Sequence, residues 1–235
     1  MSDPEQLAAA KAEPAHFTAL SSPSATSPSS IAGSAGAELG RQLRLWLARW
    51  RFYEQSSLPW NRARIHWHFM RSEAFVRWPV HGNVLSALQE GRLTVGRHTL
   101  FEPGVWITAP GAAEVRIGEG VFLNLSVMIA SLSLVEIGDH CMLANGCFVS
   151  DASHRYEDPD LPITWQGFES RGPTRIGANC WLGAHVVVTS GVSIGERCVI
   201  GANSVVTKDI EPYTVAAGAP ARPIRRLPGA PTGPR

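Results

Sequence analysis

The sequence predicts an all-β fold: a parallel solenoid of about five regular coils, preceded by an N-terminal helix with an irregular cap and by a disordered tail. Large apolar residues recur at every sixth position from Val95 onward, and extra residues are inserted only after every third six-residue unit. The 235 residues include 22 Gly and 17 Pro but only 17% charged side chains. This composition favours a turn-rich β architecture with a substantial core.

Charge and hydropathy disfavour several classes of protein. The formal net charge is only +1, so no global field would draw the whole molecule to nucleic acid. No run of eighteen apolar residues is present, and the first residues form neither a basic start nor an apolar stretch, which disfavours membrane spanning and secretion. We therefore expect a cytoplasmic location. Four Cys are too few for a disulfide scaffold.

Residues 1–40 consist mainly of Ala, Ser, Pro and Gly, with few aromatic side chains. Such a segment buries too little apolar surface to offset the conformational entropy that folding removes. We therefore predict that residues 1–40 form a disordered tail.

A basic segment rich in Trp follows, and we assign residues 41–92 to the N-terminal cap. Between Arg41 and Val80 there are eight Arg, five Trp and two acidic residues. The spacing at its start predicts a short helix with one apolar stripe. The apolar positions are Leu43, Trp46, Leu47 and Trp50, and the basic positions are Arg41, Arg44, Arg49 and Arg51. This helix either packs on the domain or lies on an anionic membrane surface, and binding of single-stranded nucleic acid is a further interpretation.

The repeat occupies residues 93–210. Its first position is large and apolar, the second is often Gly, and the fifth is small or medium-sized, as expected for a short strand followed by a tight corner. Three units close one triangular coil. The longest insertion is a loop at 151–175, and residues 211–235 form a C-terminal segment. The leading residues are Val95, Phe101, Ile107, Ile117, Leu123, Ile129, Ile137, Leu143, Val149, Ile176, Leu182, Val188, Ile194, Ile200 and Val206.

The register of the repeat orients all four Cys, because each stands four residues after a leading residue. We therefore expect these side chains to point into the solenoid as small apolar groups: Cys141, Cys147, Cys180 and Cys198. A buried thiol is inert, which argues against a Cys nucleophile and against a metal cluster.

The same register places His98, His140 and His185 at the fourth, outward position of their units. Separate corner residues of this kind are expected to be solvated. His66 and His68 share one face of a possible strand, which is a weak signal for a metal site, and we predict none.

Three segments carry a resemblance to a known family: SDASHRYEDPDLPITWQGF at 150–168, IGANCWLGAHVVVTSGVSIGERCVIGANSVVTKDI at 176–210, and AAGAPARPIRR at 216–226. From Leu93 to Arg226 the sequence resembles the hexapeptide-repeat acyltransferases. It is most similar to sugar and xenobiotic O-acetyltransferases, including those of polysaccharide and lipopolysaccharide pathways. The resemblance implies a left-handed parallel β-helix, a homotrimer with active sites between subunits, and acetyl-coenzyme A as the acetyl donor.

His154 is the candidate catalytic residue. It stands where the third coil ends and the long loop begins, and functional residues concentrate at such places. Transfer of acetyl to a sugar hydroxyl requires removal of a proton as the oxygen attacks the thioester, and a neutral imidazole suits this task. The family match supports the same role. We expect direct transfer in a ternary complex, without an acyl-enzyme.

For the acceptor, Asn124 matches by resemblance an Asn that hydrogen-bonds the sugar, although a corner Asn also stabilises a turn. The acidic acceptor contacts of some relatives correspond here to Ser131 and Leu132, so the identity of the acceptor stays open. The long loop offers further candidates to contact a sugar ring, namely Tyr156, Asp158, Trp165 and Gln166.

For the donor, the resemblance implies a groove beside the last coils. Trp181 and Ala184 would lie near the thiol end of coenzyme A, and Ala202 along its pantetheine arm. The phosphates would lie near Thr207, Lys208, Arg222 and Arg225, because cationic side chains pair with phosphate charge.

A solenoid of this kind is also compatible with functions other than acetyl transfer. Zinc-dependent carbonic anhydrase chemistry needs three imidazoles on the metal, and the His pair five residues apart that is expected for it is absent. A non-catalytic trimeric scaffold has no reason to carry His154 or the TKD ending of the last coil. An antibiotic or serine acceptor, a lipid-linked sugar acceptor and peripheral membrane contact stay open.

Overall fold

The computed structural model describes residues 31–53 and 55–229. By its contacts the chain divides into two compact units. One unit contains the first helix as far as Arg49 together with His154–Glu169, and the other contains the last residues of that helix, the cap and the solenoid.

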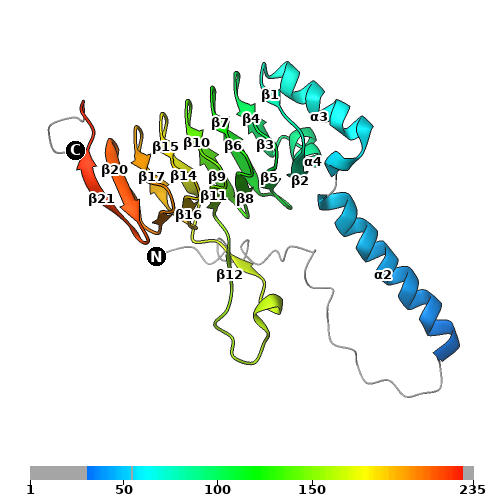
Figure 1. Ribbon diagram of the computed structural model, residues 1–235. Coiled ribbons are helices and arrows are strands. Elements are labelled where there is room, and N and C mark those ends of the chain that lie inside the picture. Colours follow the sequence, from blue (N-terminus) through cyan, green and yellow to red (C-terminus); the bar gives the residue numbers. More distant parts are fainter. Residues whose placement is uncertain (1–30, 54, 230–235) are drawn as a thin grey trace, which may run out of the picture. The chain divides into compact units, whose positions relative to one another are not determined.

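The solenoid is built from three sheets of parallel strands that the chain visits in turn, and one antiparallel strand is added at the C-terminal edge (Figure 1). Sheet I contains β1 (Phe75–Val76), β4 (Leu100–Phe101), β7 (Phe122–Leu123), β10 (Met142–Leu143), β15 (Trp181–Leu182), β18 (Val199–Ile200), β20 (Thr214–Gly218) and β21 (Ala221–Arg226). Sheet II contains β2 (Val80–Gly82), β5 (Val105–Thr108), β8 (Met128–Ala130), β11 (Phe148–Ser150), β16 (Val187–Val188) and β19 (Val205–Val206). Sheet III contains β3 (Leu93–Val95), β6 (Glu114–Ile117), β9 (Leu134–Ile137), β14 (Thr174–Ile176) and β17 (Ser193–Ile194).

The leading residues of successive coils are register partners in all three sheets, which confirms the predicted solenoid. Ile117 pairs with Ile137 in sheet III, and Leu143 pairs with Leu182 in sheet I. All leading residues are buried except Val95, which is partly buried at the first coil. Each buried aliphatic side chain contributes about 1.5–3 kcal/mol from removal of apolar surface from water. The core is therefore a set of stacked ladders of like residues.

The corners show why the second and fourth positions of the unit are special. The fourth residue adopts a left-handed backbone, with φ between 53° and 58° at seven non-glycine corners. At the second position the coils approach closely, since a Cβ on Gly177 would lie 2.5 Å from the Glu196 nitrogen. The seven corner residues are His98, Ser126, His140, Asn179, His185, Arg197 and Asn203. The three His among them are exposed, as predicted.

The cap contributes both helices and strands. β1 and β2 pair with β4 and β5, and so add a partial coil in front of Val95. The helices of the cap are η2 (Gln55–Ser57), α3 (Pro59–Arg71) and α4 (Val84–Gln89). Helix α3 buries Ile65 and Phe69, and the ring of Phe69 meets that of Phe101 edge-on at 4.9 Å. These side chains close the open end of the core.

Helix α2 (Ile31–Tyr53) precedes the cap. It begins ten residues earlier than expected, which corrects the predicted tail boundary at residue 40. Residues 31–40 contain no Pro, and a helix that is nucleated from Arg41 onward extends into them despite Gly33, Gly36 and Gly40. The other thirty residues of the predicted tail lie outside the described part of the chain. Within that part, no helix combines the length and the hydropathy of a membrane span.

The chain continues past the last predicted coil. Ile210 bridges to Ile194, β20 pairs with β18, and β21 folds back antiparallel to β20. The C-terminal segment therefore adds a partial sixth coil and an edge strand to sheet I.

Candidate functional site

His154 lies in a hairpin that leaves the solenoid after β11. Strand β12 (Ser153–His154) pairs with β13 (Phe168–Glu169), and the Arg155 amide donates a hydrogen bond of 3.1 Å to the Gly167 carbonyl. The imidazole is exposed, and its ring centroid lies 4.2 Å from that of Phe168 with a tilt of 38°. Phe168 thus supports the ring, and the residue as a whole remains exposed.

Gln166 holds the hairpin together. Its carbonyl oxygen accepts from the Asp158 amide at 3.0 Å, and its amide nitrogen donates to the carbonyls of Asp158 and Leu161, both at 2.8 Å. The helical turn η3 (Ile163–Trp165) precedes it. The polar atoms of Gln166 thus brace the loop, and its predicted contact with the acceptor stays a prediction. The side chains of Tyr156 and Trp165 are exposed.

Asp151, three residues before His154, is a fully buried carboxylate that sequence reasoning missed. It accepts hydrogen bonds from the backbone amides of Leu132, Ser133 and Leu134 at 2.6, 2.8 and 2.7 Å. Three converging amides stabilise the charge of a buried carboxylate. These three hydrogen bonds fix the backbone at the point where the chain leaves the solenoid.

Ser190 ties the start of the long loop to its end. Its hydroxyl donates to the Asp151 carbonyl at 2.6 Å and accepts from the Arg171 amide at 2.9 Å. Thr174 adds a bond of 3.0 Å from its hydroxyl to the Ser150 carbonyl. The two ends of the excursion are therefore anchored in the solenoid.

Asn124, Ala184 and Ala202 lie at the corner between sheets I and II. The Asn203 amide donates to the Ala184 carbonyl at 2.8 Å, so Ala184 and Ala202 stack in successive coils. The side-chain oxygen of Asn124 accepts from the Leu125 amide at 2.7 Å, which is a turn-stabilising contact. The structure thus places the predicted acceptor contact at the same corner as two predicted donor contacts.

The remaining predicted donor contacts fall into two groups. Trp181 on β15 is 51% exposed, and Arg222 and Arg225 lie on β21, so all three belong to sheet I. Thr207 and Lys208 follow β19 at the corner between sheets II and III, where Ser190 and Asp151 occupy the positions equivalent to Lys208 in earlier coils. Within one chain the predicted contacts therefore lie along two different edges of the solenoid.

All four Cys are buried and unbridged, as the register predicts. A hydrogen bond with the Cys180 side chain lowers the pKa of Cys198 to about 7. Burial raises the pKa of Cys147. Cys198 is 0% exposed, so no electrophile reaches its sulfur despite the lowered pKa.

Among the residues that the structure describes, no three His, Cys, Asp or Glu side chains form a metal-binding group.

Two sheets present apolar columns outward, a feature that sequence reasoning also missed. On sheet I the register partners are Phe75, Leu100, Phe122, Met142, Trp181, Val199 and Val215. On sheet II the apolar partners are Trp106, Met128, Phe148, Val187 and Val205, and the polar side chain of His81 stands at the end of the column. The sequence signal was available, because in the regular coils each of these residues immediately precedes a leading residue.

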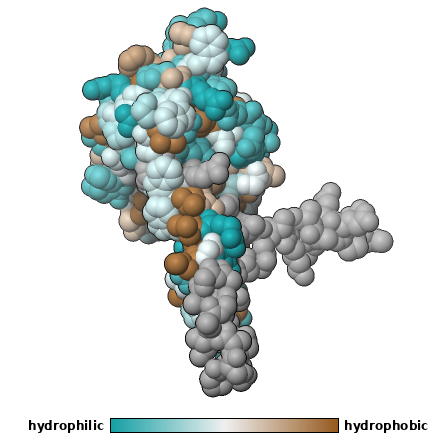
Figure 2. Space-filling view, turned by 90° about the vertical axis from the view of Figure 1, so that its right-hand side faces the viewer, coloured by the Kyte–Doolittle hydropathy of each residue, from teal (hydrophilic) through white to brown (hydrophobic). Residues whose placement is uncertain are grey.

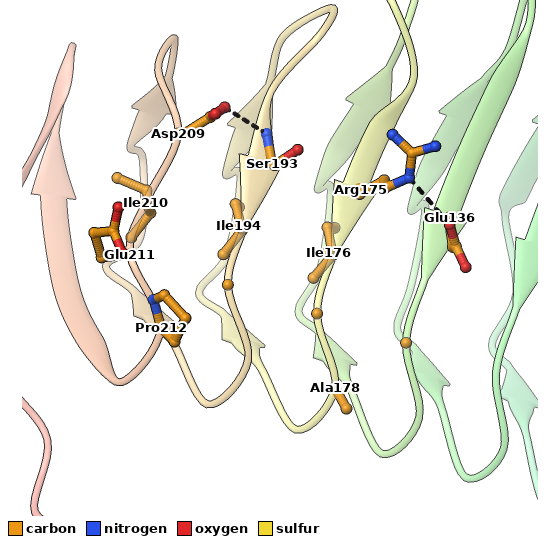
Figure 3. A pocket seen from close by; sticks show the side chains of 13 residues that line it. Glu136, Arg175, Ile176, Ala178, Ser193, Ile194, Asp209, Ile210, Glu211 and Pro212 are labelled. Carbon is orange, nitrogen blue, oxygen red and sulfur yellow. Dashed lines mark hydrogen bonds and ion pairs between the residues drawn. The ribbon is translucent and has the colours of Figure 1, made fainter. Parts of the chain in front are cut away.

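Sheet III is polar by contrast. Its outer face carries a groove of about 540 Å³, where Arg175 lies 3.3 Å from Glu136 and the Asp209 carboxylate accepts from the Ser193 amide at 2.8 Å (Figure 3). Opposite charges and hydrogen bonds satisfy these polar groups. Of the three faces, this is the one whose chemistry suits contact with water.

Comparison with known proteins agrees with this architecture. A family model described as the hexapeptide repeat of succinyl-transferase matches residues 114–151 and 173–208. The galactoside O-acetyltransferase of Escherichia coli K12 is 37% identical over 142 residues, which are 60% of this chain and 68% of that protein. A probable acetyltransferase of Mycobacterium tuberculosis is 31% identical over 194 residues, which are 74% of this chain and 64% of that protein.

Two solved structures are similar in fold and in sequence. A maltose O-acetyltransferase from Clostridium difficile 630 has a TM-score of 0.53 and 34% identity, covering 61% of this chain and 75% of that one. A galactoside acetyltransferase in complex with coenzyme A has a TM-score of 0.53 and 32% identity, covering 71% and 80%. On the stacked six-residue units and these similarities, the chain belongs to the hexapeptide-repeat O-acetyltransferase family, with its left-handed β-helix.

Proposed function

We propose that this protein transfers acetyl from acetyl-coenzyme A to a hydroxyl of a sugar or polysaccharide precursor, with His154 as the general base. The observation that carries the proposal is the exposed imidazole of His154, which follows directly on the anchored turn at Asp151. The relatives named galactoside and maltose O-acetyltransferase support a sugar as the acceptor. A cytoplasmic location stays a prediction.

The chemistry needs only a positioned base. A ring nitrogen of His154 takes the proton of the acceptor hydroxyl while the hydroxyl oxygen attacks the thioester carbonyl. The carbon–sulfur bond then breaks, and the imidazolium returns its proton to the departing sulfur of coenzyme A. Atoms and charge balance without a covalent enzyme intermediate. A positioned general base contributes on the order of 10²–10⁴ to the rate.

A panel of sugars with labelled acetyl-coenzyme A tests this function. We expect labelled acetate ester on at least one sugar or oligosaccharide, and no transfer to serine or to an antibiotic acceptor. Exposed Tyr156 and Trp165 supply aromatic surface on which a sugar ring packs, which supports this class of acceptor. Transfer to serine or an antibiotic alone would contradict the proposed acceptor class but not the acetyl transfer.

Acetyl-coenzyme A as donor is supported by the relative solved with coenzyme A. We assign the thiol end and the arm to Trp181, Ala184 and Ala202, and the phosphates to Thr207, Lys208, Arg222 and Arg225. In one chain Ala184 and Ala202 lie at the corner between sheets I and II, whereas Thr207 and Lys208 lie at the corner between sheets II and III. A complete donor site of this kind therefore requires two subunits.

The Lys208→Glu variant is expected to raise the dissociation constant for coenzyme A about tenfold or more, because it replaces a phosphate-pairing cation with a repelling carboxylate. Isothermal titration calorimetry measures the constant. Arg116→Glu is the matched control, since it reverses a charge on exposed sheet III. An unchanged constant for Lys208→Glu, or an equal loss in both variants, would remove Lys208 from the donor site.

We also propose a homotrimer, supported by the apolar columns on sheets I and II. Met142 is 46% exposed on sheet I and Met128 is 37% exposed on sheet II. Exposed apolar faces of this extent mark protein–protein contacts. If the faces of sheets I and II pack between neighbouring subunits, sheet III stays exposed to water. The corner residues of one subunit then lie against an edge of the neighbouring subunit.

Charge introduced into either column is expected to break the trimer. Met128→Glu and Met142→Glu each bury a carboxylate in an apolar contact, which is strongly unfavourable. Sedimentation velocity should give three chains for the wild type and smaller species for both variants. Thr94→Glu, at an exposed outward position of sheet III, should keep the wild-type mass. A wild-type monomer, or unchanged mass in both Met variants, would contradict this arrangement.

A further inference from the structure

Helix α2 carries an exposed apolar stripe between Leu39 and Arg49. Leu39 is 68% exposed, Leu43 54%, Trp46 58% and Leu47 40%. At ~100° per residue these four side chains occupy one sector about 100° wide. A large aromatic ring and three leucines in one sector form a surface that water solvates poorly.

The charge of the same stretch has a single sign. Arg41, Arg44 and Arg49 are its only charged residues. On the helix Arg44 and Arg49 project on either side of the stripe, each roughly 60° from its edge. Long guanidinium side chains in this arrangement lay their methylenes along an apolar surface while their charges reach outward.

This pattern selects among the possible partners. A second copy of the helix would bring arginines together with no carboxylate from this stretch to pair them, which opposes packing of stripe on stripe. Nucleic acid would use the arginines but leave the leucines in water. An anionic lipid surface satisfies both features, since acyl chains take the stripe and phosphate headgroups take the arginines.

We propose that α2 lies in the plane of an anionic membrane surface, with Leu39, Leu43, Trp46 and Leu47 facing the acyl chains. Figure 2 shows hydrophobic groups in brown beside hydrophilic groups in teal on this side of the molecule. A Trp suits the boundary between headgroups and acyl chains. The inference concerns a surface outside the proposed active site and does not depend on the proposed reaction.

Flotation of the full-length protein with vesicles tests the proposal. The vesicles contain phosphatidylglycerol and phosphatidylcholine in equal parts, or phosphatidylcholine alone. We expect binding to the anionic vesicles at least tenfold tighter than to the neutral ones, weakening as salt is raised. The double variants Leu43→Ser/Trp46→Ser and Arg44→Glu/Arg49→Glu should each lose at least tenfold in affinity. Ala48→Ser, which changes a position opposite the stripe, should bind like the wild type.

Several outcomes would overturn the proposal: no binding to anionic vesicles, equal binding to both kinds, or undiminished binding by both double variants. Binding to polyuridylic acid that exceeds vesicle binding would assign the surface to nucleic acid instead. A reduced oligomeric mass of Leu43→Ser/Trp46→Ser, without vesicle binding by the wild type, would make the stripe a subunit contact. Acetyl transfer to a soluble acceptor should not change in either double variant, so failure here is separable from failure of the proposed reaction.

Discussion

Replacing His154 with Ala is expected to lower the turnover number on the order of 10²–10⁴-fold, because the acceptor hydroxyl loses the base that removes its proton. The side chain is exposed in a hairpin and contributes nothing to the core, so the melting temperature should stay close to that of the wild type. The dissociation constant for coenzyme A should also be unchanged. Steady-state kinetics with the best sugar of the panel, together with thermal unfolding, measure these effects.

His140→Asn is the matched control for His154→Ala. His140 is also exposed, but it occupies a left-handed corner of the solenoid with φ of 57°. Asn tolerates this conformation and occupies equivalent corners at Asn179 and Asn203. The control should therefore keep both activity and stability. Turnover of His154→Ala within a factor of three of the wild type would refute the catalytic assignment.

Replacing Asp151 with Ala is expected to destabilise the fold by about 3 kcal/mol or more. The carboxylate is fully buried and accepts three backbone hydrogen bonds from residues 132–134. Removal leaves three partly buried amides without their acceptor, and each unsatisfied buried donor costs ~1–3 kcal/mol. Chemical denaturation measures the free energy of unfolding. Because the same residue anchors the chain before His154, turnover should also fall under conditions where the variant is folded.

Asp139→Ala gives the comparison for the buried carboxylate. Asp139 is exposed and accepts a single backbone hydrogen bond, from the Glu119 amide at 2.8 Å. Its removal should cost about 1 kcal/mol or less, since water replaces the lost acceptor. A loss below about 1 kcal/mol in Asp151→Ala, or equal losses in the two variants, would show that the buried hydrogen bonds do not stabilise the turn.

Much of the solenoid could be predicted from the sequence because the same contacts repeat from one coil to the next. Each coil packs only against its neighbours, so a residue's place in the six-residue unit fixes its direction. Ile137 and Leu143 face the core for the same reason that Cys141 and Cys147 do. The outward His140 follows from the same period. The resemblance then identified the family, and His154 as the residue to test.

The site could be predicted only in part, since its geometry depends on contacts between segments that no repeat relates. Gln166 looks like an acceptor contact in the sequence, and only the folded hairpin shows its amide bound to the backbone of residues 158 and 161. Asp151 looks like an ordinary loop residue until the chain passes the amides of residues 132–134.

By itself the sequence determined the coil, its core and its corners, because a six-residue period repeats the same local choice of inward and outward side chains. Only the tertiary structure decided how the loop that carries His154 is anchored, how the end of the core is closed, and which predicted contacts share an edge. Those features depend on hydrogen bonds and packing between residues far apart in the chain, such as Ser190 with Asp151 and Phe69 with Phe101. A periodic pattern contains no information about such pairs.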